Sequence, residues 1–98
     1  MNMQAMLKQA QNLQKEMMKS QEAITNMTFE AKNGLVSVVM KGNKKLDKVL
    51  IDSEDFASDD LEMLQDMIVV AVNEALAKIE KTTEEKMGKY TKGIPGLF

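Results

Sequence analysis

The sequence predicts an α+β protein built from a long helix, a three-stranded antiparallel β-meander and a second long helix. Three observations support this order. Apolar residues recur every three or four positions in the first 26 residues, then at every second position, and again at helical spacing beyond residue 60. The 98 residues match the size of one ordinary domain. We therefore expect residues 1–92 to form a single domain and residues 93–98 a C-terminal tail.

The first helix is predicted to carry a heptad seam that only Ser20 interrupts. Three lysines, Lys8, Lys15 and Lys19, are spaced seven and four residues apart, so they project together from the opposite face. We interpret the seam as core or dimer interface rather than as an adaptable methionine-rich binding surface. The predicted interface residues are Met3, Met6, Ala10, Leu13, Met17 and Ile24.

Three short strands are predicted next. Residues 27–32 alternate between apolar and polar side chains, and the dipeptide Asn33-Gly34 favours a tight hairpin because both residues tolerate positive φ. A second strand, Leu35 to Lys41, is rich in β-branched residues, and Gly42 and Asn43 mark the turn after it. A third strand, Leu46 to Asp52, completes the meander.

The second helix is predicted to begin at Ser58 or Asp59 as N-cap, with Glu62 completing a capping box. It is expected to continue to Met87, because Gly88 is the first plausible terminator. Its apolar face consists of Leu61, Leu64, Ile68, Val72, Ala75 and Ile79.

The lengths of these elements predict self-association. The two helices would be roughly 36 and 43 Å long at about 1.5 Å per residue, whereas strands of about six residues reach only about 20 Å. A sheet of that size leaves part of each apolar helix face uncovered, so we expect a symmetric homodimer with protruding, tweezer-like helical arms. The second helix would present four lysines on these arms: Lys78, Lys81, Lys86 and Lys89.

The charge of the chain is unevenly distributed. The net charge is −2, but six acids and no base lie between Ser53 and Asp66, so the other residues carry a net positive charge. Every basic residue is a lysine, and the absence of arginine removes the planar fork that reads guanine edges. Lys44, Lys45 and Lys48 form a further cluster, which is either a protective charge cluster at a sheet edge or a phosphate contact; the sequence does not rank the two.

The composition argues against enzymatic chemistry. The chain has no histidine and no cysteine, so a nucleophile and base pair or a zinc site of the usual kind cannot be assembled. The five glycines form no phosphate-cradling loop ahead of a helix. Adjacent carboxylates such as Glu84 and Glu85 point apart on a helix. We expect no enzyme activity, cofactor, metal or small-molecule substrate, no membrane association, and a cytoplasmic location.

Several local strings, in this order and spacing, resemble the YbaB/EbfC family of nucleoid-associated proteins. The strings are Met6-Leu7-Lys8-Gln9-Ala10-Gln11, Gly34-Leu35-Val36, Gly42, Asn73-Glu74-Ala75, and Met87 ahead of Gly93 to Gly96. The resemblance implies a tweezer-shaped homodimer that binds double-stranded DNA in the bacterial cytoplasm or nucleoid. The family's basic arm positions correspond here to Lys8, Lys15 and Lys19.

Two functions remain open at this point. The first is low-specificity association with duplex DNA through lysines of the helical arms. On residue pattern alone, the lysines of the first helix fit phosphate contacts and a solvated face equally well, and the resemblance favours DNA. In the second helix, Glu74 with Lys78 and Glu85 with Lys89 have the spacing of simple ion pairs, which favours a solvated face. The alternative function is a protein-interaction, adaptor or chaperone-like module that uses the same arms.

Overall fold

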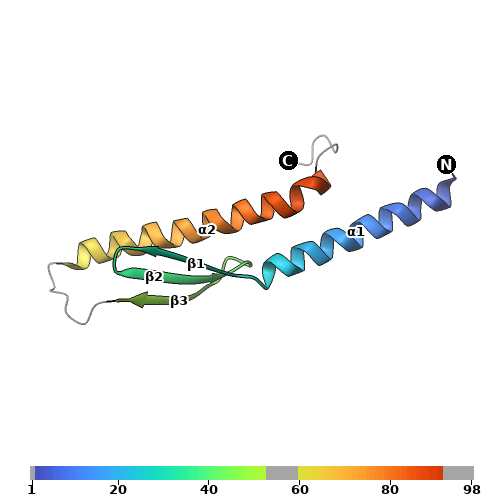
Figure 1. Cartoon of the computed structure of the whole chain (residues 1–98). Helices are drawn as coiled ribbons and strands as arrows, with labels where there is room; N and C mark the ends of the chain where they lie inside the picture. The colour runs from blue at the N-terminus through green and yellow to red at the C-terminus, as the bar shows by residue number, and fades with distance from the viewer. Residues whose placement is uncertain (1, 53–59, 92–98) are drawn as a thin grey trace.

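The computed structural model describes residues 2–52 and 60–91 and confirms the predicted α-β-β-β-α order (Figure 1). The elements are helix α1 (Met3–Thr25), strands β1 (Thr28–Asn33), β2 (Val36–Lys41) and β3 (Leu46–Ile51), and helix α2 (Leu61–Thr91). The predicted N-cap of the second helix, Ser58 or Asp59, and the predicted tail lie outside the described residues.

The molecule is elongated. Its principal extents are 71 × 23 × 14 Å and its radius of gyration is 19.7 Å, whereas a compact domain of about 100 residues has a radius of gyration of roughly 13 Å. Figure 1 shows the cause: α1 continues away from the sheet, and the C-terminal half of α2 extends in the same direction. Both helices therefore reach beyond the short sheet, as the element lengths predicted.

The three strands form an antiparallel meander in the order β1-β2-β3. The first hairpin differs from the prediction, because Asn33 pairs with Val36 and the two turn residues are Gly34 and Leu35. Gly34 has a φ of +57°, and type II′ hairpin turns place glycine at this first turn position. Asn33 extends β1 instead of turning. The second turn, at Gly42 and Asn43, agrees with the prediction, but the residue with positive φ is Lys44 at 70°.

Helix α2 packs on one face of the sheet and forms the core there. Alternate residues of β1 and β2 point into this core, and Val36 and Val38 are completely buried. Ala71 and Ala75 of α2 are also completely buried. Their small side chains allow the helix backbone to approach the strands closely, while Ile79 fills the end of the core.

Strand β3 is left uncovered. Helix α2 contacts β1 and β2, but all six residues of β3 are exposed. Leu46, Val49 and Ile51 pair with Met40, Val38 and Val36, so they lie on the same face of the sheet as the core. These apolar side chains extend the core face toward β3. Ile51 lines a small pocket with Met63 and Met67 of α2, but Leu46, Val49 and Ile51 all remain 39–45% exposed.

Helix α2 passes through Gly88 and ends at Thr91, so the predicted end at Met87 is wrong. Tyr90, which follows Gly88, is 6% exposed, and its hydroxyl lies 3.2 Å from the Ser20 hydroxyl of α1. Packing against α1 stabilises this last turn by more than the roughly 1 kcal/mol that a glycine costs inside a helix. The same contact explains why serine interrupts the apolar seam of α1.

Two local features hold α1 in place. The side chain of Asn2 caps the helix by accepting a 2.8 Å hydrogen bond from the backbone N–H of Ala5. At the other end, the backbone N–H of Gly42 donates to the carbonyl of Met27 at 2.9 Å. A Cβ atom on Gly42 would lie only 1.7 Å from the carbonyl oxygen of Ile24. Glycine is therefore required where the sheet meets the end of α1.

Candidate nucleic-acid interface

The three lysines of α1 form an exposed row. Lys8, Lys15 and Lys19 are all exposed, and successive members stand roughly 10 and 6 Å apart along the axis at 1.5 Å per residue. The exposed amide side chains of Gln11 and Asn12 flank this row on the helix surface. Lysine, asparagine and glutamine side chains all donate hydrogen bonds to phosphate oxygens. This face of α1 has the residue types that a nucleic-acid backbone requires.

The opposite face of α1 is apolar, and a single chain covers it only near its C-terminal end. Ile24 is 3% exposed and Met17 is half-buried, whereas Met3 is 78% exposed. The remaining seam residues, Met6, Ala10 and Leu13, are also exposed. The predicted interface therefore divides into a C-terminal part that packs within the chain and an N-terminal part that is open.

The four lysines of α2 are exposed, but two of them have partners within the chain. The Lys78 Nζ donates a 2.6 Å hydrogen bond to the carbonyl of Glu30, and the Lys89 Nζ lies 5.0 Å from the ring centroid of Tyr90. Lys81 and Lys86 are likewise exposed. Six acids accompany these four lysines in α2, which leaves the helix with an excess of negative charge.

The lysines near the second turn are separated by the structure. Lys44 lines a groove beside α2, whereas Lys48 pairs with Val39 and so lies on the sheet face opposite the core. Lys32 and Lys41 lie on that same outer face. No sequence motif singles out Lys32 and Lys41, although their alternation with the buried Ala31 and Met40 is a usable signal.

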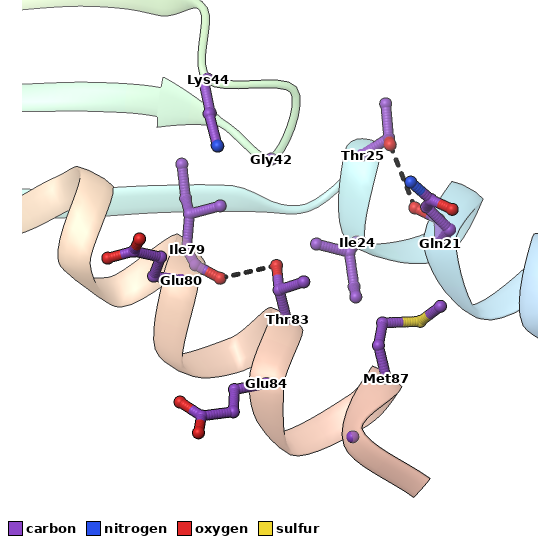
Figure 2. A pocket seen from close by; sticks show the side chains of 11 residues that line it. Gln21, Ile24, Thr25, Gly42, Lys44, Ile79, Glu80, Thr83, Glu84 and Met87 are labelled. Carbon is purple, nitrogen blue, oxygen red and sulfur yellow. Dashed lines mark hydrogen bonds between the residues drawn. The ribbon is translucent and has the colours of Figure 1, made fainter. Parts of the chain in front are cut away.

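The groove beside Lys44 has a volume of about 770 Å³ and lies between α1, the second turn and α2. Figure 2 shows Ile24, Ile79 and Met87 in its walls. Glu80 and Glu84 add two carboxylates against the single ammonium of Lys44. A phosphate would therefore meet more negative than positive charge, so the groove is a poor site for a nucleic-acid backbone.

Within residues 2–52 and 60–91, no cluster of three metal-ligating side chains occurs.

Across the part of the chain that the structure describes, no helix is long and apolar enough to cross a membrane.

The fold and the exposed lysine row define a small α+β protein with a basic helical arm. The chain belongs to the YbaB/EbfC DNA-binding family, whose model matches residues 1–94. This is a family of DNA-binding proteins rather than of enzymes, and the family predicted from the sequence is confirmed.

Proteins named as nucleoid-associated are similar to nearly the whole chain. One from Enterococcus faecalis is 48% identical over 98 residues, which cover 98% of this chain and 94% of the relative. One from Lactococcus lactis subsp. cremoris is 52% identical over 97 residues, covering 97% and 98% respectively. The crystal structure of an uncharacterized protein from Helicobacter pylori superimposes with a TM-score of 0.75 at 21% identity, covering 92% of this chain and 97% of that one. This last likeness establishes the shared fold.

Proposed function

We propose that this protein associates with duplex DNA at low sequence specificity, through lysines on its helical arms, as a component of the bacterial nucleoid. The observation that carries the proposal is the exposed row of Lys8, Lys15 and Lys19 on one face of α1. The relatives named as nucleoid-associated support the location. Phosphate contacts of this kind provide affinity through charge and fix the position of the protein on the duplex.

Low specificity follows from the side chains available. Lysine is a compact point charge on a flexible stem, whereas bidentate reading of guanine is the property of arginine, which this chain lacks. The exposed amides of Gln11 and Asn12 can donate hydrogen bonds to phosphate oxygens, which carry no sequence information. A helix bearing these groups therefore binds the backbone of many sequences with similar affinity.

We further propose that the protein acts as a homodimer. The open part of the α1 seam and the uncovered apolar face of β3 support this state. Residues 67–72 of α2 are apolar around the whole helix, and Val69 is 57% exposed. A helix segment that is apolar all round requires cover on every side. A second copy supplies that cover for all three surfaces at once.

The lysines of α2 remain part of the proposed arm surface, with a smaller expected contribution. Lys78 is already bonded to the sheet, and the six acids of α2 oppose the approach of phosphates. The main contact is therefore assigned to α1.

The test is a salt series on a variant in which Lys8, Lys15 and Lys19 are all replaced by glutamine. Fluorescence anisotropy of a labelled duplex gives the binding constant at each salt concentration. Because each neutralised phosphate contributes about 0.9 to the slope of log K against log salt, removing three lysine ammonium groups lowers the slope by about 2.7 per chain. An unchanged slope would remove α1 as the binding site.

The matched control acts on the same helix with the opposite change in charge. Replacing Glu16 and Glu22 of α1 by glutamine removes two exposed acids. If charge controls binding, this variant binds more tightly than the parent, whereas general damage to α1 would weaken binding in both variants. Circular dichroism and light scattering confirm that both variants keep their helix content and mass.

A protein-interaction module is the alternative function. The exposed apolar side chains of Leu7, Leu13 and Met18 on α1 favour it, because such groups also fit an apolar protein client. The two functions differ in their response to salt. Apolar client binding persists at high salt, whereas phosphate binding is abolished.

A further inference from the structure

We propose that the outer face of the sheet, opposite α2, is a second contact surface for the phosphate backbone of duplex DNA. This inference rests on the proposed function and extends it from the helical arm to the sheet. The outer-face lysines are defined as Lys32 of β1, Lys41 of β2 and Lys48 of β3, one from each strand.

The strand register places these three lysines on one face. Successive side chains of a strand point to opposite faces, and cross-strand partners share a face. Phe29 and Ala31 of β1 point into the core, so Lys32 points outward. In β2, Met40 is buried and Lys41 lies on the outer side, where its Nζ donates a 3.2 Å hydrogen bond to the Thr28 hydroxyl.

The third lysine joins this face through pairing with β2. Lys48 is the partner of Val39, the neighbour of buried Val38 and Met40, so it also points outward. Lys45 lies close by, since its carbonyl accepts a 2.9 Å hydrogen bond from the backbone N–H of Lys41. The three strands lie about 4.8 Å apart, and Lys32 and Lys41 lie near opposite ends of the β1-β2 ladder, so the lysines are dispersed over the outer face of the sheet.

The balance of charge distinguishes the sheet from α2. Between residues 28 and 51 there are five lysines, opposed only by Glu30 and Asp47. Helix α2 has four lysines and six acids. The sheet is therefore the more positive of the two layers, although its lysines are dispersed in the sequence and form no basic run.

The outer face of the sheet and the lysine row of α1 point to the same side of the molecule. Helix α2 packs on the inner face of the sheet, and it contacts the seam of α1 through the Ser20 and Tyr90 pair. The lysine row lies opposite that seam on α1. Both basic surfaces thus face away from α2, and in Figure 1 α1 and the sheet follow one another along the long axis of the molecule. Lysines of both elements therefore lie on one side of the molecule.

The chemistry of the outer face favours a duplex over single-stranded nucleic acid. Sheets that bind single strands stack bases on aromatic side chains. None of the outer-face side chains that the strand alternation defines is aromatic: they are Thr28, Glu30, Lys32, Ser37, Val39, Lys41, Lys48 and Leu50. Lysine and hydroxyl side chains suit phosphate oxygens, which a duplex presents along its outside.

The experiment compares two triple variants of the full-length protein. The first replaces the outer-face lysines (K32Q, K41Q and K48Q), and the matched control replaces three exposed lysines of α2 (K78Q, K81Q and K86Q). Both variants lose the same total charge. Binding to one labelled duplex is measured over a salt series, together with binding to the corresponding single strand, after circular dichroism and light scattering have confirmed the fold and mass.

The outer-face variant is expected to lower the salt slope for the duplex by up to about 2.7 per chain, at about 0.9 for each phosphate that is no longer neutralised. The α2 variant is expected to lower the slope by clearly less than the outer-face variant does, because the α2 lysines make the smaller contribution to binding. An outer-face slope equal to that of the parent would overturn the inference, as would an equal decrease in both variants. A decrease confined to the single strand would also overturn it.

These outcomes separate the inference from the proposed function. If the K8Q, K15Q and K19Q variant loses salt-dependent binding while the outer-face variant does not, the helical arm binds DNA and the sheet does not. If the parent protein fails to bind the duplex at low salt, the proposed function itself fails.

Discussion

Replacing Gly42 by alanine is expected to destabilise the protein strongly, because the new methyl group would collide with backbone. A Cβ atom there would lie 1.7 Å from the Ile24 carbonyl oxygen and 2.6 Å from its carbonyl carbon. Real Cβ contacts essentially never fall below 3.0 Å, so the last turn of α1 must move by more than about 1 Å. Overpacking costs about 1–3 kcal/mol. Because the obstacle is backbone rather than a flexible side chain, we expect a decrease of about 3 kcal/mol in the free energy of unfolding.

Chemical denaturation at fixed protein concentration measures this decrease, and Gly88→Ala is the matched control. Gly88 lies inside α2, and a Cβ atom added to it would meet nothing within 4 Å. Alanine there is expected to increase stability by about 1 kcal/mol, the usual difference between these residues in a helix. A Gly42→Ala variant as stable as the parent would refute the argument that this close approach fixes the end of α1 against the sheet.

Three further substitutions test a hydrogen bond, a core side chain and the exposed apolar face of β3. Tyr90→Phe removes the hydroxyl that contacts Ser20, and it is expected to lower the free energy of unfolding by about 1 kcal/mol. Ser20→Ala in the Tyr90→Phe background is expected to add little to this decrease, and fully additive effects in chemical denaturation would contradict the contact. Ile79→Ala, at a 1% exposed core position, is expected to lower the free energy of unfolding by about 2–5 kcal/mol. A decrease well below that range in the same assay would contradict its place in the core. Val49→Lys with Ile51→Lys charges the exposed apolar face of β3, and light scattering is expected to show the mass of a single chain in place of that of the proposed homodimer. A mass of two chains would exclude this face from the interface.

Most of the fold was predictable because periodicity reports directly on which face of an element is buried. The change from helical to alternating spacing located all three strands to within about one residue. Local glycine signals were less reliable. Gly88 was expected to end α2, but the packing of Tyr90 against α1 continues the helix, and that contact joins residues 70 positions apart in the sequence. No local pattern contains such information.

The first hairpin shows a similar limit. The dipeptide Asn33-Gly34 suggested a turn at both residues, but the ladder extends to the pair between Asn33 and Val36. The position of the turn is set by which register buries Val36 and Val38 beneath α2. A shift of one residue would move both valines to the outer face.

The candidate site was predictable where it lies on one element and not where it spans several. Lys8, Lys15 and Lys19 share a helix face by spacing alone, and all three are exposed. Lys32 and Lys41 come together with Lys48 only through pairing of three strands. The alternation within each strand places these lysines opposite the apolar positions, but their assembly on one face depends on the register of all three strands.

Low-specificity DNA binding is tested most directly by a fluorescence-anisotropy titration of the parent protein with two labelled duplexes of the same length and unrelated sequence, at low and physiological salt. Both duplexes are expected to bind with similar affinity, and this affinity is expected to decrease steeply as salt increases. Absence of binding at low salt, or affinity that does not change with salt, would contradict the proposed function.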